Sequence, residues 1–148
     1  MKESSYYGTM KSKLIKEIGG KIIKIADRAT LGIPDSMHVG LGIVSYIETK
    51  IYNIHNQDSI VPWEVIKKDI RQYEMCKEIR KYALVLYVIY CPNIKMTAVL
   101  DVNTIAEHFF KNDHILMKSS TSFVKGHGIE LITQKIMDWR QRVREYLN

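Results

Sequence analysis

Apolar side chains recur every three or four positions over residues 3–18, the spacing of one face of an α-helix. We therefore expect a helix here, ended by Gly19-Gly20. The pattern then changes to short apolar runs separated by turn-prone residues, over residues 21–26, 33–39 and 43–51. These runs predict three strands joined by short turns, a three-strand meander.

Helical spacing returns over residues 63–81 and predicts a second helix. Residues 82–90 are almost all apolar, which predicts a strand that is covered on both faces. Residues 95–100 are expected to form a further strand that pairs with it across a short turn. The tyrosines of this region are expected in the core; they are Tyr82, Tyr87 and Tyr90.

The last third of the chain predicts a helix over residues 101–110 with Asp101 as its N-cap, a loop over residues 118–128, and a basic amphipathic helix over residues 129–147. Together the elements predict an α/β fold, with a mixed sheet flanked by helices. We expect one domain over residues 1–148, with a core over residues 1–100 and a C-terminal helical extension.

Composition adds a preference for a polyanionic partner. The 148 residues include 22 Lys and Arg against 16 Asp and Glu, a formal net charge of +6, and the isoelectric point is near 9.2. Nucleic acid is the leading candidate, although the same balance also serves solubility. The two cysteines form no paired motif, and no apolar run has the length of about 20 residues that a membrane span needs, so we expect an intracellular, soluble protein without membrane contact.

The stretches that indicate chemistry are Gly32-Ile33-Pro34-Asp35 and Glu48-Thr49-Lys50. Side chains alternate between the faces of a strand, so Glu48 and Lys50 point the same way. If the strands at either side of the Gly40 to Gly42 turn pair, the carboxylate of Asp35 converges with that of Glu48. Such a pair suits Mg²⁺, with Mn²⁺ expected to substitute.

Carboxylate-held metal ions assist phosphodiester cleavage by neutralising charge on the phosphate and activating water. Lys50 supplies a further positive charge, which would orient the attacking water, help lower its pKa or stabilise the transition state. The bland alternative is that Asp35 is a turn residue and that Glu48 and Lys50 form an incidental ion pair on a solvated face.

These two stretches resemble the motif of the PD-(D/E)xK nuclease superfamily, in particular the small archaeal Holliday-junction resolvases and VRR-Nuc domains. The resemblance covers roughly residues 3–90 and implies a restriction-endonuclease-like fold: an N-terminal helix, a three-strand meander, a helix and a strand. It also implies a third acidic ligand at the start of the first helix, for which Glu3 is the candidate and Glu17 the weaker one. Gln72 matches a glutamine near the metal site, although the gap from Lys50 is longer here than in the compact relatives.

The resemblance implies a Mg²⁺-dependent endodeoxyribonuclease acting on branched DNA, a homodimeric Holliday-junction resolvase. A dimer also follows from chemistry, because two symmetric cuts need two sites and one small domain provides one. The alternatives are a restriction-type or general nuclease on duplex DNA, and a non-catalytic DNA-binding protein with the same fold.

Basic residues in the N-terminal part of the chain are candidates for a surface that contacts DNA phosphates, because such contacts dominate affinity. The alternative is that they serve only solubility. The set comprises Lys11, Lys13, Lys24 and Arg28. Of the histidines, His38 is expected to be a solvated strand residue and His127 a residue of a flexible loop.

Overall fold

A computed structural model describes residues 3–25, 32–54, 59–60, 62–108, 115–116 and 122–147. Its centre is a mixed six-stranded sheet in the spatial order β1-β2-β3-β5-β6-β8. The strands are β1 (Lys21–Lys24), β2 (Ser36–Gly40), β3 (Ile43–Ile51), β5 (Leu84–Cys91), β6 (Met96–Asp101) and β8 (Phe123–Lys125). Neighbouring strands are antiparallel except β3 and β5, which run parallel. The expected α/β class and mixed sheet are confirmed.

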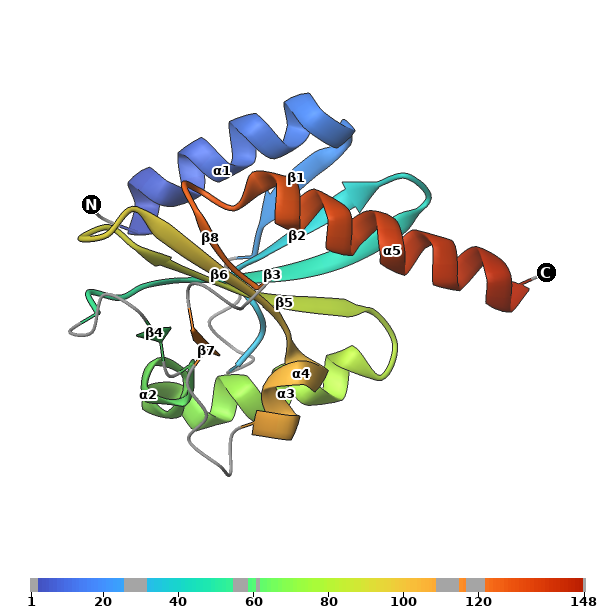
Figure 1. Ribbon diagram of the computed structural model, residues 1–148. Coiled ribbons are helices and arrows are strands. Elements are labelled where there is room, and N and C mark those ends of the chain that lie inside the picture. Colours follow the sequence, from blue (N-terminus) through green and yellow to red (C-terminus); the bar gives the residue numbers. More distant parts are fainter. Residues whose placement is uncertain are drawn as a thin grey trace.

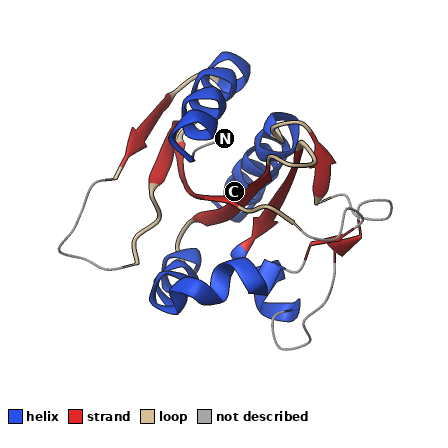
Figure 2. Ribbon diagram, turned by 90° about the vertical axis from the view of Figure 1, so that its left-hand side faces the viewer, coloured by secondary structure: helices blue, strands red, loops and turns tan. Residues whose placement is uncertain are grey.

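Helices cover both faces of this sheet, as Figures 1 and 2 show. One face carries α1 (Glu3–Ile18) and α5 (Ile129–Leu147), and we call it the α1 face. The other, the α3 face, carries α2 (Pro62–Ile66), α3 (Ile70–Arg80) and α4 (Val102–His108). Every residue of β5 is buried, because this central strand has helices above and below it.

The expected meander of β1, β2 and β3 is present, and β3 has the predicted bounds. The second strand begins at Ser36 rather than at residue 33, since Pro34 has no N–H for the ladder. The turn between β2 and β3 consists of Leu41 and Gly42, with φ values of 59° and 77°. Two consecutive positive φ values are typical of the tightest hairpin turns, and the carbonyl of Leu41 accepts a hydrogen bond from Arg140 Nε of α5 at 3.1 Å.

The helix predicted over residues 63–81 is wrong as a single element. The segment instead forms α2, a 3-10 helix η1 (Lys67–Asp69) and α3. The break occurs at Asp69, whose backbone leaves the helical region and whose side chain accepts the N–H of Gln72 at 3.1 Å. Asp69 is therefore the N-cap of a new helix, which fixes where α3 starts.

Two further predictions need correction. The predicted loop over residues 118–128 contains β8, which pairs with β6; a strand of three residues is too short to show a period. Tyr87 and Tyr90 are buried as expected, but Tyr82 is 86% exposed because it lies in the turn between α3 and β5. A second, two-stranded sheet of β4 (Ser59–Ile60) and β7 (Ile115–Leu116) was not anticipated.

The later elements follow their predicted positions. β6 pairs with β5, and Asp101 accepts the N–H of Asn103 at 3.0 Å, in the manner of the expected N-cap of α4. The closing helix α5 spans the predicted residues, and its last turns extend beyond the sheet (Figure 1). Among the described helices, none has both the length and the apolar character that crossing a membrane requires.

Candidate active site

The pairing of β2 with β3 brings Asp35 next to Glu48. Ser36 lies opposite Ile47 in this antiparallel pair, so the next residues outward, Asp35 and Glu48, meet where β2 begins. The backbone N–H of Asp35 donates to Oε1 of Glu48 at 3.0 Å. The two acidic residues predicted from the motif are therefore in contact.

Glu48 and Lys50 share the α3 face, as the alternation along β3 predicted. Lys50 Nζ lies 3.6 Å from Glu48 Oε2. The side chain of Glu48 is only 3% exposed, whereas that of Lys50 is 24% exposed. A buried carboxylate thus has beside it an ammonium group that reaches solvent, which differs from the solvated surface pair of the bland alternative.

Thr49 holds the carboxylate of Asp35 through one of its two oxygens. Its Oδ2 accepts two hydrogen bonds from Thr49, at 2.6 Å from Oγ1 and at 3.2 Å from the backbone N–H. Its Oδ1 is buried and has no hydrogen-bond partner. Burial raises the pKa of Asp35, and the hydrogen bonds from Thr49 and the charge of Lys50 oppose that rise. The result is a fixed carboxylate with one oxygen left to bind a cation or proton.

Helix α3 lies against the loop that carries Asp35. A Cβ atom on Gly32 would come within 2.7 Å of the carbonyl of Arg71 and 3.0 Å of Cβ of Met75, and Gly32 has a φ of +93°. Only glycine fits such a close approach with this backbone conformation. The glycine that precedes the motif therefore brings α3 close to the site.

Gln72 and Cys76 lie one turn apart on α3. Burial raises the pKa of the Cys76 thiol to about 12, with a further contribution from the charge of Glu48. This interaction indicates that this side of α3 faces the acidic pair. The Oε1 atom of Gln72 is buried without a hydrogen-bond partner, so it is a second oxygen available to a ligand.

These oxygens are of the type that a magnesium ion binds. Mg²⁺ binds through one or two carboxylates and keeps several waters, and it prefers oxygen ligands. Asp35 and Glu48 offer carboxylate oxygens, and Gln72 offers an amide oxygen. Among the side chains that the structure describes, no three His, Cys, Asp or Glu residues are grouped as a metal site. A site here would therefore depend on Gln72, on water or on the predicted third acid.

That third acid, Glu3, begins α1, but its side chain lies outside the described part of the structure. Tyr7 lies four residues later on α1. Burial raises the pKa of its hydroxyl, and the charge of Asp35 raises that pKa further, so Tyr7 lies close to the site. Glu17 lies at the far end of α1 and lines a groove with α5.

The motif did not predict Thr49, Tyr7 or Cys76 as neighbours of the acidic pair. Alternation along β3 turns the Thr49 side chain away from Glu48, and only the position of Asp35 at the rim of the sheet brings the two together. Tyr7 and Cys76 are apolar positions within helical patterns and are typical core residues by that pattern. Their closeness to the site follows from how α1 and α3 pack.

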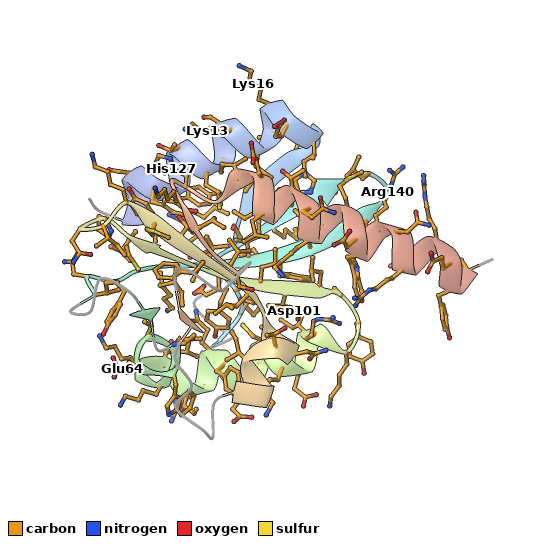
Figure 3. All side chains as sticks on the ribbon, viewed as in Figure 1. Lys13, Lys16, Glu64, Asp101, His127 and Arg140 are labelled. Carbon is orange, nitrogen blue, oxygen red and sulfur yellow. The ribbon has the colours of Figure 1, made fainter. Side chains whose placement is uncertain are left out.

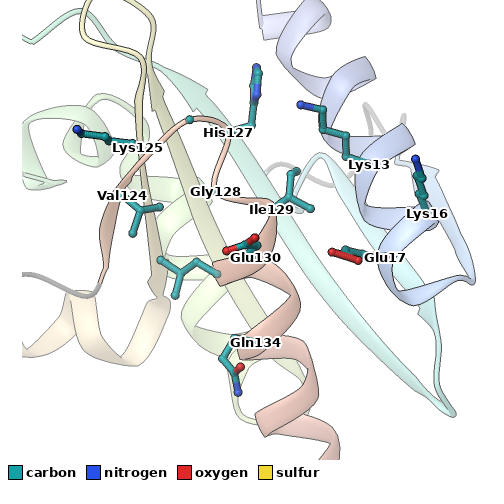
Figure 4. Close-up of a pocket in the computed structure, with 12 residues that line it drawn as sticks. Lys13, Lys16, Glu17, Val124, Lys125, His127, Gly128, Ile129, Glu130 and Gln134 are labelled. Carbon is teal, nitrogen blue, oxygen red and sulfur yellow. The ribbon is translucent and has the colours of Figure 1, made fainter.

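The predicted DNA-contacting residues are not all in one place. Arg28 lies outside the described residues, and Lys11 is exposed on α1. The ammonium of Lys24 lies 5.2 Å from the centroid of the Tyr7 ring. Lys13 lines a groove of about 820 Å³ between α1 and the start of α5 (Figures 3 and 4). This groove is also lined by Lys16, Lys125, His127, Glu17 and Glu130, so it carries both signs of charge.

His38 does not have the expected surroundings, whereas His127 lies in a turn as expected and has aromatic rings beside it. His38 is fully buried, and its Nε2 lies 2.9 Å from the carbonyl oxygen of Gly19, because the strand face expected to be solvated is covered by α1. His127 stacks on the rings of Tyr6 and Tyr90, at centroid distances of 5.9 and 5.4 Å. Burial lowers its pKa, and the charge of Lys13 lowers it further.

The chain matches no protein-family model and no curated protein. Among solved structures it is similar to Hjc, a Holliday junction resolvase from the archaeal hyperthermophile Archaeoglobus fulgidus. The identity is 14%, the match covers 70% of this chain and 75% of that chain, and the TM-score is 0.42. A likeness this remote does not identify a function for this chain.

Proposed function

We propose that this protein is a metal-dependent endodeoxyribonuclease whose active site contains Asp35, Glu48 and Lys50. The supporting observation is the contact of the buried Glu48 with the half-buried Asp35, and of Glu48 with a lysine that reaches solvent. A cation between acids and an ammonium beside them is an arrangement suited to an anionic substrate with a phosphodiester bond. The formal charge of +6 favours DNA as that substrate.

In this proposal Asp35, Glu48 and Gln72 hold Mg²⁺, with Mn²⁺ able to substitute, and Glu3 is a further candidate ligand. The bound ion would neutralise charge on the scissile phosphate and lower the pKa of a coordinated water. Thr49 orients Asp35 and favours its ionised form through its two hydrogen bonds. Lys50, anchored on Glu48, directs its ammonium toward the phosphate and stabilises the negative charge that grows there during cleavage.

The substrate that we propose is branched DNA, with four-way junctions as the first choice and a homodimer as the active form. Resolution of a junction needs two cuts, and each chain supplies one site. Light scattering of the purified protein would measure its mass in solution, and a monomer on its own and on junction DNA would contradict this part of the proposal.

The test is cleavage of a labelled four-way junction in the presence of Mg²⁺, beside linear duplex of the same sequence. We expect Asp35→Asn and Lys50→Ala to lower the rate by at least about a hundredfold, in line with the loss of a charged group that acts in the transition state. Lys81→Ala is the matched control, because Lys81 is an exposed lysine at the opposite end of the β3–β5 pair from Lys50. Variants that cut like the wild type would contradict the site, and equal cutting of linear duplex would favour a general nuclease.

A further inference from the structure

Lys24 stands on the other side of Asp35 from Lys50. It lies opposite Ser36 in the β1–β2 pair, and Ser36 lies opposite Ile47. Residues directly opposite each other in antiparallel strands point to the same face, and Ile47 belongs to the core beneath α1. The side chain of Lys24 is therefore on the α1 face, whereas Lys50 is on the α3 face.

Lys24 is also tied closely to the main chain of the site. The residue after it, Ile25, donates its backbone N–H to the carbonyl of Asp35 at 2.8 Å. The strand that carries Lys24 thus runs directly beside the residue that we propose as a metal ligand. Lys24 is itself exposed, so its ammonium is accessible to a large substrate.

Tyr7 gives this ammonium a defined position. Lys24 Nζ lies over the Tyr7 ring, 5.2 Å from its centroid, a geometry in which the ring quadrupole attracts the charge. The ring is itself fixed, because Tyr7 packs against the core beneath α1. A solvated lysine samples many rotamers, but one held against a fixed ring loses less freedom when it binds a ligand.

We propose that Lys24, held by Tyr7, binds a backbone phosphate of the DNA strand next to the scissile one. Lys24 and Lys50 lie on opposite faces of the sheet with Asp35 between them, so we assign them to different phosphates. Lys24 is then a substrate-positioning residue and Tyr7 the residue that positions it. This inference rests on the proposed function, because it requires that the DNA strand passes over Asp35.

The test uses Lys24→Ala and Tyr7→Leu, with Lys21→Ala as the matched control. Lys21 is an exposed lysine of the same strand, and its side chain points to the opposite face. Affinity for labelled junction DNA is measured in EDTA over a series of salt concentrations, and kcat and KM are measured separately with Mg²⁺.

For Lys24→Ala we expect affinity to fall about tenfold and the slope of log affinity against log salt to become shallower by about one. KM should rise by a similar factor, with kcat within about twofold of wild type, as expected for uniform binding. Tyr7→Leu should reproduce part of the loss in affinity, and Tyr7→Phe, which restores the ring, should recover it.

The inference is overturned if Lys24→Ala has the affinity and salt slope of Lys21→Ala. It is also overturned if Lys24→Ala lowers kcat and leaves KM unchanged, because that result would describe a group acting only in the transition state. A wild-type protein that binds DNA and never cuts it would contradict the proposed function. In that case the affinities measured in EDTA still show whether Lys24 binds a DNA phosphate.

Discussion

The backbone N–H of Asp35 donates a hydrogen bond to Oε1 of Glu48 at 3.0 Å, across the start of the β2–β3 pair. The main chain of Asp35 therefore orients the buried carboxylate of Glu48. Two acids that repel each other as charges are thereby kept together, which is the condition for a shared cation.

Neutralising Glu48 should weaken metal binding without unfolding the protein. In Glu48→Gln the amide oxygen still accepts the N–H of Asp35, but the charge that favours a cation is gone. We expect the affinity for Mg²⁺ or Mn²⁺, measured by isothermal titration, to fall by at least about tenfold. Glu64→Gln is the control, since Glu64 is an exposed carboxylate that accepts a hydrogen bond from the Tyr52 hydroxyl and is not one of the proposed ligands. Unchanged metal binding in Glu48→Gln would remove this residue from the site.

Removing the hydroxyl of Thr49 should shift the pH dependence of cleavage. Thr49→Val deletes the 2.6 Å bond to Asp35 and so raises further a pKa that burial has already raised. Asp35 must be ionised to hold a cation, so the acid limb of the rate profile should move to higher pH. At a pH on that limb the rate should fall about tenfold, the value of one hydrogen bond to a charged group. Thr49→Ser retains the donor and should restore the wild-type profile, whereas identical profiles for Val and Thr would contradict the role.

Asp35→Asn should stabilise the protein at neutral pH. A pKa raised above its ordinary 3.8 means that the folded state binds the proton more tightly than the unfolded state. The free energy of unfolding therefore falls as pH rises from that value through the higher native pKa, and the charge remains a cost at pH 7. Relief of that cost should add about 1 kcal/mol, or about 2–4 °C in Tm.

The gain of Asp35→Asn should shrink as pH is lowered toward 4, which thermal unfolding at several pH values would measure. Asp138→Asn, on an exposed part of α5, is the control and should show no such pH-dependent gain. A lower Tm for Asp35→Asn at pH 7 would mean that the carboxylate stabilises the fold.

Gly32→Ala should separate α3 from the site. The added Cβ would lie 2.7 Å from the carbonyl of Arg71, at a φ of +93° that disfavours alanine. We expect a loss of about 2 kcal/mol in the free energy of unfolding, from strain and displaced packing. Cleavage measured well below Tm should fall as well, because Gln72 moves with α3. Gly8→Ala, in the exposed interior of α1 with no atom within 4 Å of its new Cβ, should instead stabilise by up to about 1 kcal/mol. A cleavage rate retained in Gly32→Ala would argue against a role for α3.

Local pattern predicted much of this fold and the centre of the candidate site. The alternation of side chains along β3 placed Glu48 and Lys50 on one face, and the glycine turn at Leu41 placed β2 beside β3. Both signals are properties of neighbouring residues, which have the same geometry in any protein. The break at Asp69 was missed because apolar spacing continues across it, although an Asp in an N-cap position was visible in the sequence.

Packing between distant elements decided the rest. Thr49 binds Asp35 only because Asp35 lies at the rim of the sheet, and His38 is buried only because α1 covers its strand face. The cation–π contact of Lys24 with Tyr7 joins residues that are separated by the rest of α1, a turn and the first residues of β1. These contacts depend on how the helices sit on the sheet. The pattern of apolar and polar residues along the chain does not give the distance between residues that are far apart in sequence. The sequence by itself determined which chemical groups are present and which face of its strand each one occupies. The tertiary structure alone decided which of those groups meet.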